Sequence, residues 1–132
     1  MLTADLDILW RREKSMTLKL QEVEELTRQI AQAADRDDET SVTILLSMRE
    51  EPVRQLYAAD QALRESLEKL PQTDAVRARE LLEGSEARID EELPLVQQVG
   101  QYRRLLKTVR ELDQRISLRV GGNRSFYKSF RQ

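Results

Sequence analysis

Clusters of carboxylates are the residues of this 132-residue chain whose types could do acid–base chemistry. Two clusters stand out, "DRDDE" at 35–39 and "DEE" at 90–92. Carboxylates act as general acid and base where a cleft shifts their pKa values apart. The first cluster coincides with an expected helix boundary, and the second has basic residues nearby. We therefore interpret both as solvated surfaces and predict no catalytic residues there.

Other kinds of catalytic site are limited by what the chain lacks. It contains no cysteine and no histidine, which removes thiolate nucleophiles, zinc fingers and imidazole bases. It has no EF-hand spacing, no glycine-rich nucleotide loop and no nucleophile elbow. We expect a protein that is not an enzyme and that uses no cofactor and no metal.

The charge balance concerns partners and location. The chain has 22 basic and 24 acidic residues, a net charge of −2, whereas nucleic-acid binders usually carry a clear basic surplus. The N-terminal "MLTADLDILWRREK" has acids where a secretory signal has bases, and no stretch approaches the roughly 18 apolar residues of a membrane span. We expect a cytoplasmic protein that meets membranes only indirectly.

The C-terminal stretch differs from the rest of the chain. Residues 119–132, "RVGGNRSFYKSFRQ", contain three aromatic and four basic residues and no acid. The two glycines predict a helix end at about residue 120. Three alternatives remain for this tail: its rings cover the end of the bundle, it docks a protein partner through aromatic anchors, or it binds nucleic acid or a membrane. The candidate partner-binding residues are Leu105, Leu118, Arg124, Phe126, Tyr127, Lys128 and Phe130.

Apolar residues at steps of three and four predict the elements that must position these residues. Helices are expected at about 3–35, 39–70 and 74–118, with a break or a kink at 84–94 because Gly84 and Pro94 lie there, and with a kink in the second helix at Pro52. Short connections favour antiparallel neighbours. The sequence therefore predicts an all-α fold, an elongated antiparallel bundle or coiled coil of three or four helices with kinks, formed by residues 1–118 and followed by the tail at 119–132.

Each expected helix has an apolar seam that predicts the core. In the first helix the seam is Leu2, Leu6, Leu9, Met16, Leu20, Val23, Ile30 and Ala34, with Glu13 and Thr27 in two of its slots. The second seam is Leu45, Leu56, Leu63, Leu67 and Leu70, joined by Met48 and Val53, and the third is Leu95, Val99, Tyr102, Leu106, Val109, Leu112 and Ile116. The expected N-terminal caps are Thr3 or Asp5, then Asp37, Asp38 or Ser41, then Thr73 or Asp74.

Further apolar residues lie off or beside these seams: Leu46, Tyr57, Leu81, Leu82, Leu105 and Leu118. Three long helices bury a narrow core, so this surplus predicts either a groove for a partner's amphipathic helix or a homodimer.

A spaced pattern in residues 18–70 resembles a known family. Its positions are Leu26-Thr27, Asp37-Asp38, Val42, Leu45-Leu46, Arg49, Val53, Leu56, Asp60 and Leu63. This pattern is similar to that of flagellar export chaperones of the FlgN and FliT type, with Pro52 as a departure. The resemblance implies a cytoplasmic chaperone that binds amphipathic C-terminal helices of late flagellar subunits and delivers them to the membrane export gate.

Two other function classes remain open from the sequence. A self-associating coiled-coil assembly or scaffold protein would satisfy its seams with copies of itself and stay oligomeric over a range of concentrations. A nucleic-acid-binding regulator would show affinity that falls steeply with added salt.

Overall fold

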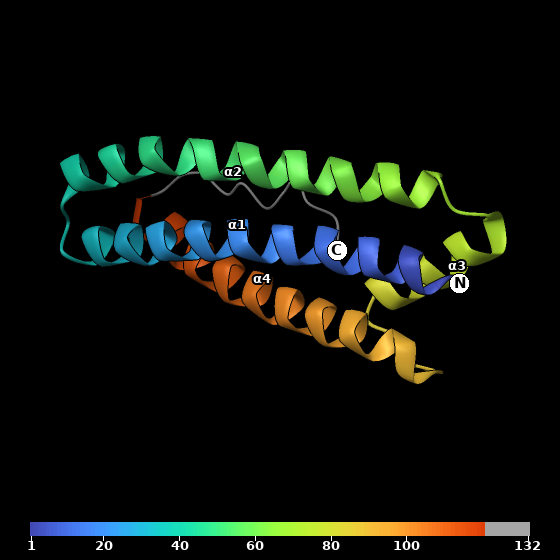
Figure 1. Ribbon diagram of the computed structural model, residues 1–132. Helices are drawn as coiled ribbons and strands as arrows, with labels where there is room; N and C mark the ends of the chain where they lie inside the picture. The colour runs from blue at the N-terminus through green and yellow to red at the C-terminus, as the bar shows by residue number, and fades with distance from the viewer. Residues whose placement is uncertain (121–132) are drawn as a thin grey trace.

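The computed structural model describes residues 1–120 and shows an elongated all-α bundle without a strand in that range (Figure 1), which confirms the predicted fold class. Its elements are α1 (Thr3–Asp35), α2 (Glu39–Glu68), α3 (Gln72–Leu82), the 3-10 turn η1 (Asp90–Glu92) and α4 (Leu93–Val120). The long helices run up, down and up. The glycines expected to end the last helix lie outside the described residues.

Helix α1 is the centre of the bundle, because it packs along both α2 and α4. Its buried positions continue the predicted heptad spacing over nearly the whole helix, and Glu13 and Thr27 are buried in their two slots. The prediction that Leu2 belongs to this buried seam was wrong: Leu2 is 70% exposed because it precedes the first turn of the helix. Trp10 is partly buried and packs at the edge of the core.

The sequence predicted a break or a kink at 84–94, and the structure has a break there, between α3 and α4. Gly84 has a φ of +104°, and the Ser85 N–H donates to the Glu80 carbonyl, so the end of α3 is closed by a left-handed glycine. Pro94 is the second residue of α4, where its missing N–H leaves no hydrogen bond unmade. Both residues therefore mark helix ends.

Helix α2 is continuous from Glu39 to Glu68 with Pro52 inside it, as one helix was expected there. Asp38 caps it, accepting from the Ser41 N–H at 3.1 Å. The other predicted caps were wrong: Leu2 and Pro71 stand before α1 and α3, with no side-chain cap bond. The placement of Met48 in the second seam was also wrong, since this side chain is 55% exposed.

A polar layer divides the core into two apolar clusters. The Arg49 guanidinium donates to Thr27 Oγ1 at 3.1 Å and to Asp113 Oδ1 at 3.2 Å, so one buried group on α2 joins α1 and α4. Nearer the α3 end, Gln98 donates to Thr17 at 2.9 Å and joins α4 to α1 again. Such layers fix the register of helices, because any slip leaves buried polar groups without partners.

The interpretation of the 90–92 cluster as a solvated surface was wrong for Glu92, which is 4% exposed. Its carboxylate accepts two bonds from Arg77, at 2.7 and 3.0 Å, and one from the Arg88 N–H at 2.8 Å. The hydrogen bonds from Arg77 lower the pKa of Glu92 to about 2. This bidentate pair holds the 83–92 segment against α3.

We expect Arg77→Ala to lower the free energy of unfolding by about 2 kcal/mol, since it removes hydrogen bonds to a buried charge. Amide hydrogen exchange across residues 83–92 and urea unfolding measure the effect. The matched control is Arg88→Ala, whose side chain is 70% exposed and reaches Glu80 only at 3.9 Å. The Arg77 contribution is fully present above pH 4.5 and is lost as the pH falls through about 2, because the folded-state pKa of Glu92 is the lower one. Equal exchange rates in both variants would contradict the assignment.

Candidate functional site

The structure describes two of the sequence-predicted site residues, Leu105 and Leu118, and does not bring these two together. Leu105 is half-buried against the main core, while Leu118 is 87% exposed, thirteen residues and about 20 Å further along α4. Arg124, Phe126, Tyr127, Lys128 and Phe130 lie outside the described residues. Leu81, expected among the surplus leucines, is fully buried because α3 turns it into the core.

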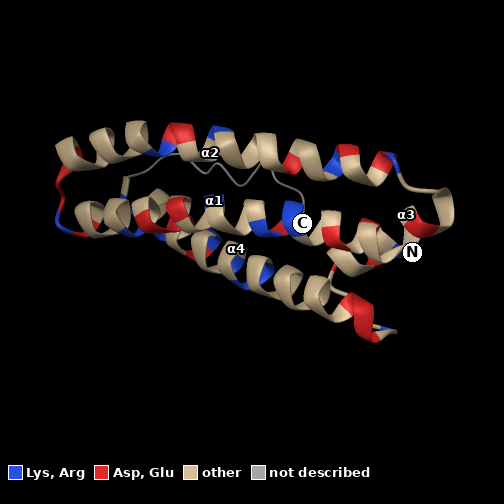
Figure 2. Ribbon diagram, in the orientation of Figure 1, with Lys and Arg blue, Asp and Glu red and all other residues tan. Residues whose placement is uncertain are grey.

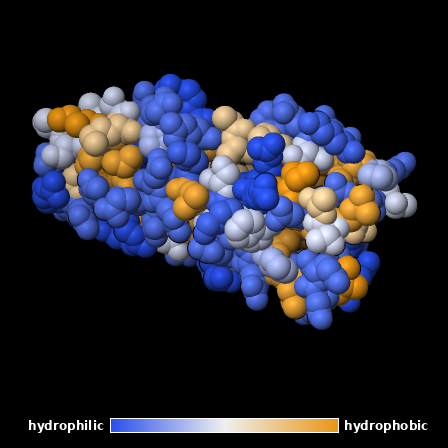
Figure 3. All heavy atoms as spheres, in the orientation of Figure 1, coloured by the Kyte–Doolittle hydropathy of each residue, from blue (hydrophilic) through white to orange (hydrophobic). Residues whose placement is uncertain are grey.

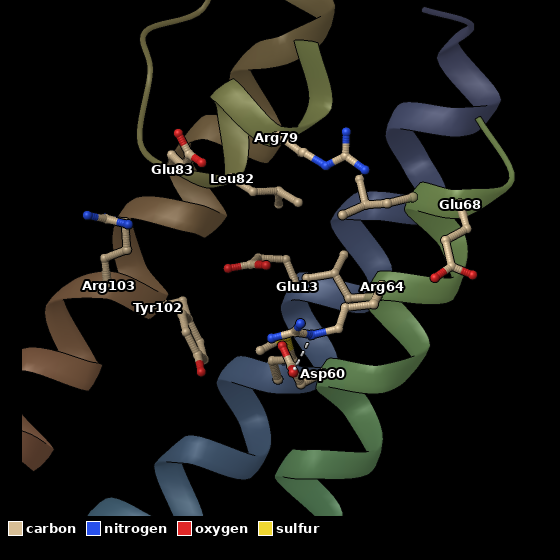
Figure 4. Close-up of a pocket in the computed structure, with 12 residues that line it drawn as sticks. Glu13, Asp60, Arg64, Glu68, Arg79, Leu82, Glu83, Tyr102 and Arg103 are labelled. Carbon is tan, nitrogen blue, oxygen red and sulfur yellow. Dashed lines mark hydrogen bonds and ion pairs between the residues drawn. The ribbon is translucent and has the colours of Figure 1, made fainter. Parts of the chain in front are cut away.

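A cleft of about 430 Å³ opens where α3 lies between the ends of α2 and α4, with α1 as its floor (Figure 4). Pockets of this volume are in the range that holds small ligands or single side chains. The lining residues are Glu13 and Met16 from α1, Asp60, Leu63, Arg64, Leu67 and Glu68 from α2, Arg79, Leu82 and Glu83 from α3 and its end, and Tyr102 and Arg103 from α4.

Glu13 occupies the centre of the cleft, as Figure 4 shows, and is 4% exposed. Burial, and to a lesser extent the nearby Asp60 carboxylate, raises the pKa of Glu13 from 4.5 to about 7, while Arg103 acts in the opposite direction. Asp60 itself is bonded to Arg64 at 2.9 Å. The Glu13 carboxyl therefore changes charge near neutral pH.

Tyr102 forms one wall of the cleft and is 2% exposed. Its hydroxyl is buried and has no hydrogen-bond partner within residues 1–120. Burial raises the pKa of this phenol, and the acids Glu13 and Asp60 add to the effect. The phenol is therefore neutral at physiological pH and serves as a wall of the cleft.

A second candidate surface lies on the side of α1 and α2 that faces away from α4, and we call it the α1/α2 groove. Two shallow hollows follow it, one against Pro52 and the other beside Ser41. The apolar residues that line the two hollows are Leu18, Leu26, Ile44, Leu45 and Pro52. Met48 lies on α2 between them, four residues from both Ile44 and Pro52. Leu18, Ile44 and Met48 are 48%, 55% and 55% exposed. Figure 3 shows hydrophobic spheres gathered near the left end of the molecule, where α1 and α2 approach their connecting turn, with hydrophilic residues around them.

The charges around these two surfaces are mixed in sign. Figure 2 shows basic and acidic residues interspersed along α1, α2 and α4. Several of them form pairs one helical turn apart, such as Arg28 with Glu24 and Arg54 with Glu51. Neither surface presents a broad field of one sign to a ligand.

Sequence reasoning missed the cleft, although it contained a signal. Glu13 was recognised as a polar residue in an apolar seam, and an acid at a core position is costly unless something compensates it. The other lining residues come from four helices, and no spacing in the sequence relates them.

The chemistry available in the cleft is proton exchange and charge pairing. Its lining holds carboxylates, guanidinium groups and a phenol, with no hydroxyl of serine or threonine. Within residues 1–120, no group of three or more acidic, histidine or cysteine side chains is placed to hold a metal ion. Over the same range, no helix combines the length and the apolar character needed to cross a membrane.

Comparisons of this chain with protein-family models, with curated proteins and with solved structures found no match.

Proposed function

We propose that this protein is a non-catalytic chaperone that covers an amphipathic helix of a partner protein in the α1/α2 groove. The observation that carries the proposal is the exposure of three large apolar side chains, Leu18, Ile44 and Met48, in or beside the two hollows along α1 and α2. A soluble helical pair normally turns such side chains inward, and a contiguous exposed set marks an interaction surface.

An amphipathic helix suits this groove better than an extended segment. The groove lies between helices whose own backbone bonds are satisfied, so it has no strand edge for an extended chain to pair with. A helix satisfies its own backbone and presents one apolar stripe. From Leu18 to Gln32 the groove follows α1 for about 21 Å, which matches roughly four turns of a bound helix.

The resemblance of residues 18–70 supports a class of client. Under this proposal the client is the C-terminal helix of a late flagellar subunit, the chaperone works in the cytoplasm, and it passes the client to the export gate. Such a helix would otherwise self-associate, and its burial in the groove removes the same apolar surface from water.

The test is binding of a peptide with the last 20 residues of a late flagellar subunit. We expect Ile44→Ser/Met48→Ser to weaken binding by about 2 kcal/mol, roughly thirtyfold, because two half-exposed side chains lose their burial in the complex. Titration calorimetry measures the affinity. The matched control is Val76→Ser/Ile89→Ser, which changes two side chains of similar exposure on the α3 side of the molecule.

Two outcomes contradict the proposal. Equal loss of affinity in both variants would show that the groove is not the binding surface. A parent protein that sediments as a stable dimer, and becomes a monomer only when Ile44 and Met48 are replaced, would show that a second copy of the chain covers the groove.

A further inference from the structure

The carboxyl group of Glu13, at the centre of the cleft, has no hydrogen-bond or ion-pair partner within residues 1–120. Glu13 is buried, and within residues 1–120 its side chain accepts no hydrogen bond and forms no ion pair. Its carboxyl oxygens are not among the fully enclosed polar atoms without a partner, so they are reached from the open cleft. A carboxyl directed into an open cleft of about 430 Å³ can find that partner in a ligand.

The charged groups that face Glu13 decide the sign of such a ligand. They are Asp60, Arg64 and Glu68 on α2, Arg79 and Glu83 on α3 and its end, and Arg103 on α4. Arg64 is bonded to Asp60 at 2.9 Å, and neither Arg79 nor Arg103 lies within ion-pair distance of Glu13. Four carboxyl groups and three guanidinium groups line the cleft, so its lining carries one excess negative charge when Glu13 is ionised. The group that complements this charge is a cation.

The apolar residues of the cleft add a second requirement for the ligand, which is carbon surface that can contact them. Met16, Leu63, Leu67 and Leu82 contribute carbon surface to the cleft beside the carboxyl. A small hydrated inorganic ion makes no use of that surface. A cationic head on an aliphatic stem places its charge at Glu13 and its carbons against the leucines, as lysine and arginine side chains do.

We propose that the Glu13 cleft binds an ammonium or guanidinium group carried on an aliphatic stem, with Glu13 accepting its hydrogen bonds and Leu63, Leu67 and Leu82 contacting the stem. This site is separate from the α1/α2 groove and does not depend on the function proposed for that groove. Two sources present this chemistry: a basic side chain of a partner, or the chain's own Arg124, Lys128 and Arg131.

The experiment uses the full chain labelled with ¹³C at glutamate carboxyls, and follows the Glu13 resonance by NMR while pentylammonium chloride is added at pH 8. We expect a saturable shift of this resonance and a fall of about one unit in the Glu13 pKa at saturation, equivalent to tenfold tighter cation binding by the charged carboxyl. Pentylguanidinium tests the second head group. Pentanol, with the same stem and no charge, should leave the resonance unchanged.

Two variants serve as matched controls, in protein labelled with ¹³C at the leucine methyl groups. Glu13→Gln keeps the shape of the side chain and should abolish the pentylammonium response at the leucine methyl groups of the cleft. Glu25→Gln removes an exposed carboxylate of α1 outside the cleft and should preserve that response. Circular dichroism confirms that both are folded.

A full-chain variant with Arg124→Gln, Lys128→Gln and Arg131→Gln separates the two sources. If only this variant binds pentylammonium, the chain's own basic residues fill the cleft in the parent. If both bind it equally, the cleft is open to a partner's side chain. The proposal is overturned if neither responds, if pentanol matches pentylammonium, or if Glu25→Gln removes the response as completely as Glu13→Gln.

Discussion

Replacing Asp113 with alanine is expected to lower the free energy of unfolding by about 3–5 kcal/mol, the cost of breaking a buried ion pair by removing one member. Asp113 and Arg49 bond at 3.2 Å, with side chains 3% and 5% exposed. The variant keeps the buried guanidinium charge of Arg49 and takes away its carboxylate. Urea unfolding followed by circular dichroism measures the difference.

Two further variants identify the cause of that loss. Glu24→Ala removes a carboxylate from an ion pair one helical turn from Arg28 near the surface, and it should cost about 0.5 kcal/mol. The double variant Arg49→Met/Asp113→Leu replaces both charges with apolar side chains and should recover most of the lost stability. A cost below about 1 kcal/mol for Asp113→Ala would contradict the role of this layer in the core.

The sequence predicted most buried positions of α1 and α4, because the polar residues of the core lie at regular positions in the apolar spacing of these helices. Thr27 takes the slot between Val23 and Ile30, so the heptad spacing continues through it. In α4, Asp113 lies between Val109 and Ile116 in the same way. Periodicity reports which face of a helix is buried, whatever the residue at each slot, and this property is local to one helix.

Predictions that depended on contacts between helices were less successful. Leu81 and Met48 both lie in apolar runs, yet Leu81 is fully buried and Met48 is 55% exposed. Leu81 is buried because the short α3, which ends at Leu82 just before the break at Gly84, packs it into the core, whereas Met48 lies on an exposed part of α2. Neither the orientation of α3 nor the opening between α2 and α4 follows from the spacing of residues within any one segment.

The candidate site also depends on contacts between helices, which the spacing within one helix does not predict. Leu118 was predicted to be available to a partner, and its 87% exposure agrees with that. The cleft was not predicted, because its lining residues are brought together from four helices. The sequence did show Glu13 as an interruption of an apolar seam, and the structure gives that interruption a location at the centre of a cleft.

Glu13→Gln is expected to stabilise the protein at pH 8 by about 3 kcal/mol and to leave its stability unchanged near pH 4. The pKa of Glu13 is about 7 in the folded state against 4.5 as an ordinary carboxyl, and each unit of difference corresponds to about 1.4 kcal/mol. Because the folded state holds the proton more tightly, stability from this group is full below pH 4.5 and is lost as the pH rises to about 7. Glutamine keeps the shape of the side chain and carries no charge, so the stability of the variant does not fall as the pH rises to about 7.

Urea unfolding at unit intervals from pH 4 to pH 8 tests this expectation, with the difference between variant and parent growing between pH 4.5 and 7. Glu25→Gln, an exposed carboxylate on the same helix, is the control and should show no such growth. A variant less stable than the parent at pH 8 would mean that the charged carboxylate has a compensating partner in the folded protein. In that case, adding pentylammonium would not raise the stability of the parent at pH 8. If the carboxylate lacks a partner, the same addition should narrow the gap between parent and variant, because the cation supplies the charge that burial leaves uncompensated.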